Sequence, residues 1–274
     1  MTSRFDFVSF LSDYGRTDEF VGVCHGVMLD LAPHLRVVDV THDVPAFDVR
    51  AGGLALARSV QYLPQGLVRA VVDPGVGTER RCLAVEVAHG VLVGPDNGLL
   101  APAVALLGGP QRIVALQNEQ YRLPAPGPTF AGRDIMAPAV AHIANGVPLG
   151  VLGDEVDPAS VTPGILPLPN VEDGMVQAEV LWVDRFGNCQ LNVDPDLLRE
   201  LGVRPGESVE LRIGESGRRA RWAHTFADAN PSELLLVVDS YGSCALAYDR
   251  RSAAAELKLR AGSTLTLAPQ GAGS

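Results

Sequence analysis

The most restrictive feature of this sequence is a change of pattern at a proline-rich segment, residues 163–170. Before it, strand-like and helix-like runs alternate, beginning with a strand at 5–11 and a helix at 18–31. Such alternation predicts an α/β fold with a mainly parallel sheet flanked by helices. After it, we find only short strand-like runs, from 175–183 to 264–267, which predict a small antiparallel β-barrel or sandwich.

The two patterns divide the chain into two expected domains. We expect an α/β domain over residues 1–165 and an antiparallel, β-barrel-like domain over residues 172–270. The segment PGILPLPN between them is a stiff linker, because each proline fixes its own φ angle. The 274 residues, of which 47% are hydrophobic, are sufficient for a core in each domain.

Charge and composition exclude several function classes. The formal net charge is −10, with 22 basic and 32 acidic residues, and we find no basic stripe. We therefore expect neither nucleic acid nor an anionic membrane as a partner. The four cysteines form no CxxC pair, the N-terminus lacks a signal pattern, and no apolar run approaches the roughly 20 residues of a membrane helix. These features predict a cytoplasmic protein with reduced thiols.

The run VVDPGVGTERR at 71–81 ends an apolar strand in a Pro/Gly turn. In open α/β sheets, ligands bind outside the carboxyl ends of strands, so Asp73 and Arg80 lie where chemistry is usually done. The glycines at 75 and 77 resemble the start of a phosphate cradle, but neither a third glycine nor a Lys-Ser/Thr pair follows. The segment is therefore either a turn with a surface salt bridge or a catalytic Asp73–Arg80 pair.

Two other acidic motifs follow expected strands. Asp13, in SDYGRTD, belongs either to a turn that caps the next helix or to a site where its carboxylate accepts hydrogen bonds from a ribose diol. The run DVTHDVPAFD at 39–48 mixes Asp with His42, but its spacing matches no recognised metal-ligand pattern. We expect no metal and a packed His42, and we expect Phe47 to be either core or a face for a purine or sugar.

Three loop motifs carry weaker signals. GPDNGLL at 94–100 is a turn before a helix, and TFAGRD at 129–134 leads into a helix N-terminus. DRFGN at 184–188 is a turn between two strands. In that turn, Asn188 and a neighbouring aromatic ring could recognise an adenine edge, and a purely structural turn is the alternative.

In this order, the motifs resemble those of the S-adenosyl-L-methionine (SAM) hydroxide adenosyltransferase family, which is related to SAM-dependent fluorinases and chlorinases. The resemblance covers nearly the whole chain. It implies hydrolysis of SAM to adenosine and L-methionine by in-line attack of water at the ribose C5′, with SAM as substrate and without metal or organic cofactor. It also implies a homotrimer in which SAM lies between one subunit's first domain and its neighbour's second domain.

The resemblance implies substrate contacts in the first domain. Asp13 would accept hydrogen bonds from the ribose hydroxyls, Asp18 would hold the methionine ammonium group, and Phe47 would lie beside the ribose. Further substrate-binding positions implied in this domain are Asn97, Phe130 and Gly132.

In the second domain, the resemblance implies that Asp184, Phe186 and Asn188 contact methionine and adenine. Ser240 would help to bind the methionine carboxylate, although Tyr241 stands where halogenating relatives carry Arg. Ala253 is the last substrate-binding position implied here.

The catalytic residues decide between water and halide. Fluorinase-like members carry Tyr at the position of Asp73, and a carboxylate would repel a halide but can orient water or accept its proton. Hydrolytic members carry an Asp–Arg–His triad with the His in TFHGRD, whereas this chain has Ala131 there. Ala131 is either an engineered substitution or a natural variant, and it implies reduced activity. The alternatives are a protein that binds SAM or adenosine without turnover, and a halide adenosyltransferase.

Overall fold

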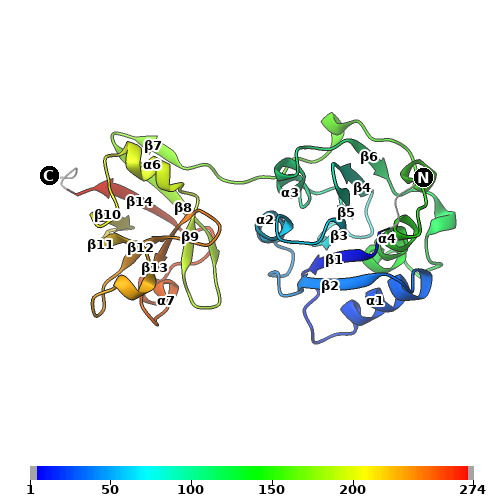
Figure 1. Ribbon diagram of the computed structural model, residues 1–274, viewed down its shortest axis with the longest axis horizontal. Coiled ribbons are helices and arrows are strands. Elements are labelled where there is room, and N and C mark those ends of the chain that lie inside the picture. Colours follow the sequence, from blue (N-terminus) through cyan, green and yellow to red (C-terminus); the bar gives the residue numbers. More distant parts are fainter. Residues whose placement is uncertain (1–4, 271–274) are drawn as a thin grey trace. The chain divides into compact units, whose positions relative to one another are not determined.

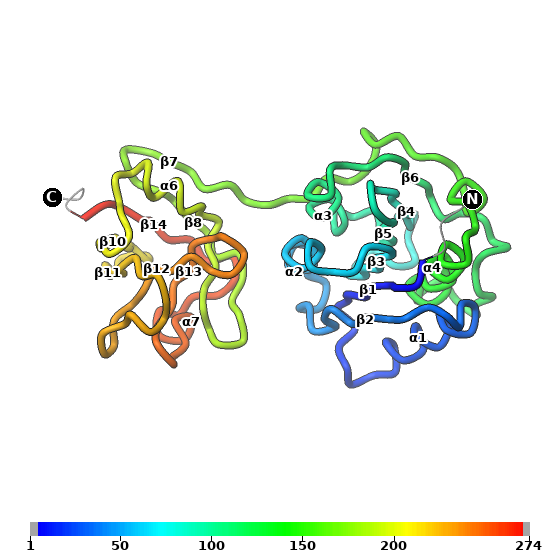
Figure 2. Tube along the Cα trace, in the orientation of Figure 1, coloured from blue at the N-terminus to red at the C-terminus, as the bar shows by residue number. Residues whose placement is uncertain are grey.

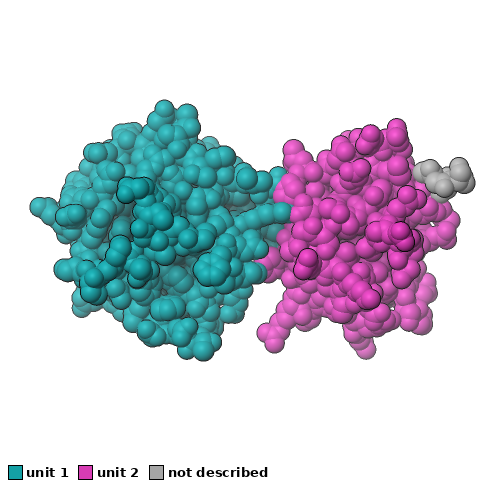
Figure 3. Space-filling model, turned by 180° about the vertical axis from the view of Figure 1, so that it is seen from behind, with its two compact units in different colours: residues 1–166 teal, residues 167–274 magenta. Residues whose placement is uncertain are grey.

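A computed structural model describes residues 5–270 and divides them into two compact units (Figure 3). The first unit runs to Leu166 and the second begins at Pro167. Each unit has its own hydrophobic core. Among the described residues, no helix is both long enough and apolar enough to span a membrane.

The first unit is built on a six-stranded sheet with the strand order β2-β1-β3-β5-β4-β6 (Figure 1). Only β4 runs against the other five strands, which confirms the predicted, mainly parallel sheet. Its strands are β1 (Phe7–Ser12), β2 (Arg36–Thr41), β3 (Gly66–Val71), β4 (Cys82–Val87), β5 (Gly90–Pro95) and β6 (Arg112–Ala115).

Helices cover this sheet in two pairs (Figure 1). α1 packs with α4 in the core that also holds Val8, Leu67 and Val91, and α2 packs with α3. Cys24 and Met28 are the fully buried side chains of α1, spaced one turn apart so that they face this core. The helices are α1 (Phe20–Leu31), α2 (Val49–Val60), α3 (Ala101–Leu106), α4 (Ala137–Ala144) and α5 (Leu149–Leu152).

The second unit is a closed barrel of seven strands, in which β14 pairs with both β10 and β8 (Figure 2). Closure confirms the predicted barrel and removes the exposed sheet edges. β7 adds to one end of β8 outside the ring. Its strands are β7 (Asn170–Glu172), β8 (Met175–Val183), β9 (Cys189–Leu191), β10 (Ser208–Ile213), β11 (Ser216–Ala223), β12 (Leu235–Val238), β13 (Cys244–Ala247) and β14 (Thr264–Pro269).

Three local predictions for the second unit were incomplete. Strand β11 was not expected because its first half, SGRR, is polar and exposed, yet it forms a hairpin with β10. Two short helices, α6 (Pro195–Glu200) and α7 (Ala253–Leu257), interrupt what was expected to be strands alone. Each begins with a side-chain cap, from Asp194 and Ser252, that the sequence pattern did not reveal.

Candidate active site

The carboxyl ends of the parallel strands β1, β3 and β5 bring several predicted site residues to one edge of the sheet. The backbone N–H of Asp13 donates to the carbonyl of Val71 over 3.2 Å. Asn97 donates from Nδ2 to the carbonyl of Val72 over 2.8 Å, which braces the end of β5 against the end of β3. Asp73 follows directly, so its position is fixed by three strands rather than by a free loop.

Asp73 and Arg80 form a buried ion pair. Arg80 Nη2 donates to Asp73 Oδ2 over 2.5 Å, and the two side chains are only 10% and 6% exposed. The surface salt bridge that the sequence left open is therefore wrong. Burial raises the pKa of the Asp73 carboxyl, and the positive charge of Arg80 opposes that rise. Asp73 Oδ1 and Arg80 Nε have no hydrogen-bond partner among the described residues.

Asp13 contacts Phe47, the other residue for which a role at the ribose was predicted. The backbone N–H of Phe47 donates to Asp13 Oδ2 over 2.9 Å. Phe47 adopts a φ of +67°, which is unfavourable for a bulky residue, and its ring is 72% exposed. Asp18 lies in an exposed bend, and helix α1 begins after Glu19 without a side-chain cap, so the predicted capping does not occur.

The loop at 129–132 is held by an aromatic cluster. Phe130 packs edge-on against Tyr14 and Phe20, with ring centroids 5.6 and 5.3 Å apart. Ala131 is buried in the core of the first unit. A Cβ atom at Gly132 would lie 1.9 Å from the Tyr14 hydroxyl oxygen, so any other residue there would have to displace the Tyr14 ring. Burial raises the pKa of that tyrosine, so its hydroxyl group remains protonated.

Arg69 is a residue of this region that the sequence analysis missed. It lies in the middle of β3 with no exposed surface, and its Nη2 donates to the carbonyl of Gly132 over 2.6 Å and to Cys24 Sγ over 3.2 Å. Its guanidinium carbon lies 4.0 Å from the ring centroid of Phe10. The signal was a lone arginine inside the apolar run LVRAVV. Burial of a guanidinium group without a carboxylate partner lowers the stability of the fold, because the group loses its hydration. Arg69 therefore anchors the 129–132 loop but reduces the free energy of unfolding.

In the second unit, Asp184 organises its own turn. Its Oδ1 accepts hydrogen bonds from the backbone N–H groups of Phe186 and Asn188, both over 2.9 Å, and its Oδ2 accepts from Asn188 Nδ2 over 2.7 Å. The Ser252 side chain lies against Gly187, and the N–H of Ala254 donates to the Gly187 carbonyl. The turn and the start of α7, including buried Ala253, therefore form one rigid corner.

This corner carries a pocket of about 380 Å³. Phe186, which is 78% exposed, and Asn188 line this pocket; adenine recognition by these two residues stays a prediction. Other lining residues were not predicted, because they come from separate segments that only the fold brings together: Phe226, Tyr248, Arg250 and Ser252.

Ser240 does not line that pocket; it lies exposed in the turn between β12 and β13, which Asp239 closes by accepting from the N–H groups of Tyr241 and Ser243.

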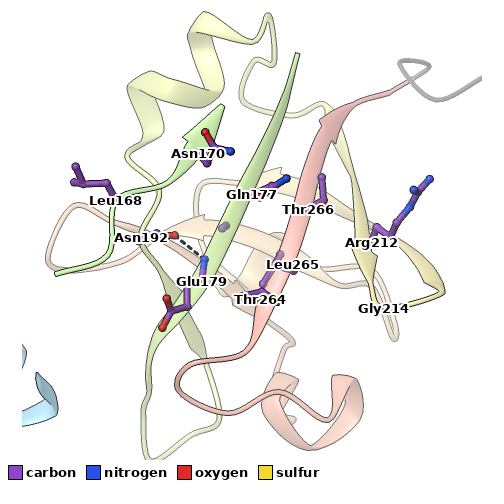
Figure 4. A pocket seen from close by; sticks show the side chains of 11 residues that line it. Leu168, Asn170, Gln177, Glu179, Asn192, Arg212, Gly214, Thr264, Leu265 and Thr266 are labelled. Carbon is purple, nitrogen blue, oxygen red and sulfur yellow. Dashed lines mark hydrogen bonds between the residues drawn. The ribbon is translucent and has the colours of Figure 1, made fainter. Parts of the chain in front are cut away.

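A separate polar groove of about 460 Å³ lies on the barrel (Figure 4). The backbone N–H of Glu179 donates a hydrogen bond to Asn192 Oδ1 across this groove. None of the predicted site residues lines it.

One group of side chains in the first unit has donor atoms suited to a metal: His25, Asp39 and His42. The sequence prediction of no metal considered only the motif at 39–48, and His25 lies outside that motif on α1.

Comparisons with known proteins show which family the chain resembles over most of its length. The family model of the SAM hydroxide adenosyltransferase N-terminal domain matches residues 8–153, and that of the C-terminal domain matches residues 178–266. An (R)-S-adenosyl-L-methionine hydrolase from Salinispora tropica is 45% identical over 94% of this chain and 96% of its own. A fluorinase from Actinoplanes sp. is 28% identical over 95% and 96%. The crystal structure of an uncharacterized conserved protein from Thermotoga maritima has a TM-score of 0.88 at 32% identity, covering 95% of this chain and 99% of that one.

Proposed function

The chain belongs to the SAM hydroxide adenosyltransferase family, and from this premise we propose that it hydrolyses S-adenosyl-L-methionine to adenosine and L-methionine. The observation that carries the proposal is the buried Asp73 carboxylate. Arg80 holds one of its oxygens, and no described residue makes a hydrogen bond of good geometry to the other, although the backbone N–H of Gly75 lies close enough to the carboxyl to lower its pKa. Buried polar atoms normally have partners, so this oxygen is available for the attacking water.

In the proposed reaction, Asp73 Oδ1 accepts a hydrogen bond from the water and aligns its lone pair with the ribose C5′. The C5′–O bond forms as the C5′–S bond breaks, and methionine leaves with the electron pair that neutralises its sulfonium. The proton lost by the water passes to Asp73 or to solvent. Because the sulfonium is a good leaving group, positioning of the water supplies most of the rate enhancement. We propose no cofactor for this reaction.

Substrate recognition is divided between the two units in this proposal. Asp13 and Phe47 hold the ribose, and Asp18 binds the methionine ammonium group. Phe186 and Asn188 recognise the adenine through the pocket at the α7 corner, which supports this assignment by combining an exposed ring with polar groups. Further proposed substrate contacts are Asn97, Phe130, Gly132, Asp184, Ser240 and Ala253.

We also propose a homotrimer, in which each site combines the first unit of one subunit with the second unit of its neighbour. Exposed aromatic rings on both units, 72% for Phe47 and 78% for Phe186, support this arrangement. Light scattering after size-exclusion chromatography tests it, and a monomer at micromolar concentration contradicts it.

The test of function is incubation of the purified protein with SAM in the presence of a chelator. We expect adenosine and methionine in equal amounts. Bound SAM without products would support the second candidate function, which is binding of SAM without turnover. This candidate rests on buried Ala131, which stands at the position of the expected His. If neither the unsubstituted chain nor Ala131→His forms adenosine, the catalytic assignment is wrong. Chloride-dependent formation of 5′-chloro-5′-deoxyadenosine would indicate halide transfer instead.

A further inference from the structure

We propose that His25, Asp39 and His42 form a binding site for a divalent transition-metal ion, and that zinc matches their donor atoms best. His25 lies on α1, Asp39 lies in β2, and His42 follows β2 directly. One ligand atom from each residue lies within 4.8 Å of the other two. The three residues are brought together by the packing of α1 beside β2 and not by any local motif.

The distances within the group are close to those of a coordination sphere. His25 Nε2 lies 2.9 Å and His42 Nε2 lies 3.0 Å from Asp39 Oδ1. Zinc bonds of about 2.0–2.1 Å in tetrahedral geometry separate neighbouring ligand atoms by about 3.3 Å. An increase of about 0.3–0.4 Å in these two distances would bring Asp39 Oδ1 to that separation from each ring nitrogen. The ligand atoms of all three residues lie within 4.8 Å of one another.

His42 is already oriented as a metal ligand. Its ring is almost fully buried, with Phe10 packed edge-on at 4.6 Å, and its Nδ1 lies 2.7 Å from Ser12 Oγ. Its Nε2 makes no hydrogen bond of strict geometry and lies 3.0 Å from Asp39 Oδ1, close enough to lower the pKa of that carboxyl. Ligating histidines usually donate their second ring N–H to a neighbour, and a bond from Nδ1 to Ser12 leaves the Nε2 lone pair for the metal.

The remaining coordination position faces solvent. The side chains of His25 and Asp39 are 28% and 31% exposed, so water can occupy the fourth position beside three protein ligands. Two imidazoles and one carboxylate suit zinc and its neighbours in the transition series. Calcium and magnesium prefer oxygen ligands alone and are poor candidates.

The metal would stabilise the loop that begins at Asp13 rather than take part in the reaction. Ser12 holds the ring of His42 and is followed by Asp13, and the N–H of Gly15 donates to the His42 carbonyl over 2.8 Å. An ion bound to His42 would thus fasten α1, β2 and the β1–α1 loop to one another.

The test is titration of the chelator-treated full-length protein with zinc chloride in a calorimeter, without SAM, so that its result does not depend on hydrolysis. We expect one zinc per chain, binding at least about tenfold weaker in His25→Gln and in Asp39→Asn, and unchanged binding in His89→Gln, an exposed histidine elsewhere. Buried His42 is left intact so that the variants fold, which circular dichroism checks.

Cobalt(II) provides a second readout, since tetrahedral coordination by nitrogen and oxygen gives a visible absorption band that is much stronger, and at longer wavelength, than the weak band of octahedral aqueous cobalt. We expect that band in the natural protein and its loss in His25→Gln. The proposal is overturned if the chelator-treated natural protein binds no zinc. It is equally overturned if folded His25→Gln and Asp39→Asn bind zinc as the natural protein does.

Discussion

Arg80 and Arg81 each form an ion pair with an aspartate, but the two pairs differ in how many of their polar atoms are hydrogen-bonded. Arg81 donates from Nε to Asp96 Oδ2 over 2.8 Å and reaches the Ser160 carbonyl over 2.7 Å, while Asp96 Oδ1 accepts from the N–H of Thr162. The neighbouring pair, Asp73 with Arg80, is equally well buried at the aspartate but leaves Asp73 Oδ1 and Arg80 Nε without partners among the described residues.

The difference separates structure from function. Every oxygen of the Asp96 carboxylate is used to fasten residues 160–162 to the end of β5, which is what a structural ion pair does. In the Asp73–Arg80 pair, the aspartate oxygen without a hydrogen bond does not stabilise the fold, because an unsatisfied buried acceptor lowers the free energy of unfolding by about 1–3 kcal/mol. We therefore expect changes at Asp96 to affect stability and changes at Asp73 to affect the reaction.

The largest expected effect is that of Asp73→Asn. The asparagine amide cannot accept a proton from the attacking water, and it orients that water less well than a carboxylate does. We therefore expect kcat to fall about 10²–10⁴-fold, with SAM binding retained. Adenosine release measured at saturating SAM gives kcat, and calorimetry gives the affinity.

Asp96→Asn is the matched control for that variant. It weakens the ion pair with Arg81, so we expect the free energy of unfolding to fall by about 1–3 kcal/mol, while kcat per folded molecule stays within about twofold. Denaturant unfolding of both variants gives the stability. The comparison fails if Asp96→Asn lowers kcat as strongly as Asp73→Asn does.

The second prediction concerns pH. Burial raises the pKa of Asp73 above its usual value, so the folded protein binds that proton more tightly than the unfolded chain does. Because ionised Asp73 is the active form, kcat should fall as pH drops through this raised pKa. Arg80 opposes the rise. We therefore expect Arg80→Met to move the acidic limb of the kcat profile to higher pH, and an unmoved limb would contradict the assignment.

The same shift has a defined sign for stability. With a folded pKa above the unfolded one, Asp73 contributes stability when both states are protonated, and this contribution is lost as pH rises through the folded pKa. Asp39 has a lowered pKa in spite of its partial burial, through its contacts with His42 and His25, and so contributes stability that is lost as pH falls instead.

A smaller effect is expected from the second unit. Phe186→Ala removes an exposed ring without touching either ion pair, so we expect KM to rise about 5–20-fold from lost base stacking, with kcat changed less than about threefold. Steady-state kinetics separates the two constants. A loss confined to kcat would place Phe186 outside adenine recognition.

The sequence predicted the first unit well because its strands are continuous apolar runs whose ends carry the conspicuous polar motifs. Asp73 and Arg80 were predicted as a pair, yet their burial, which removes the surface-bridge alternative, could not be predicted from a local turn pattern. Strand β11 was missed because its exposed half resembles a loop. Arg69 was missed because its partners, the Gly132 carbonyl and Cys24, lie on other elements.

The central claim is that water held by Asp73 attacks the ribose C5′, and hydrolysis in ¹⁸O-labelled water tests it most directly. Mass spectrometry of the isolated adenosine shows whether the label has entered and, after fragmentation, at which oxygen. The account predicts one ¹⁸O atom in the 5′-hydroxyl group, formed by the natural protein and strongly reduced in Asp73→Asn. Unlabelled adenosine, or labelled adenosine formed equally fast by Asp73→Asn, would contradict it.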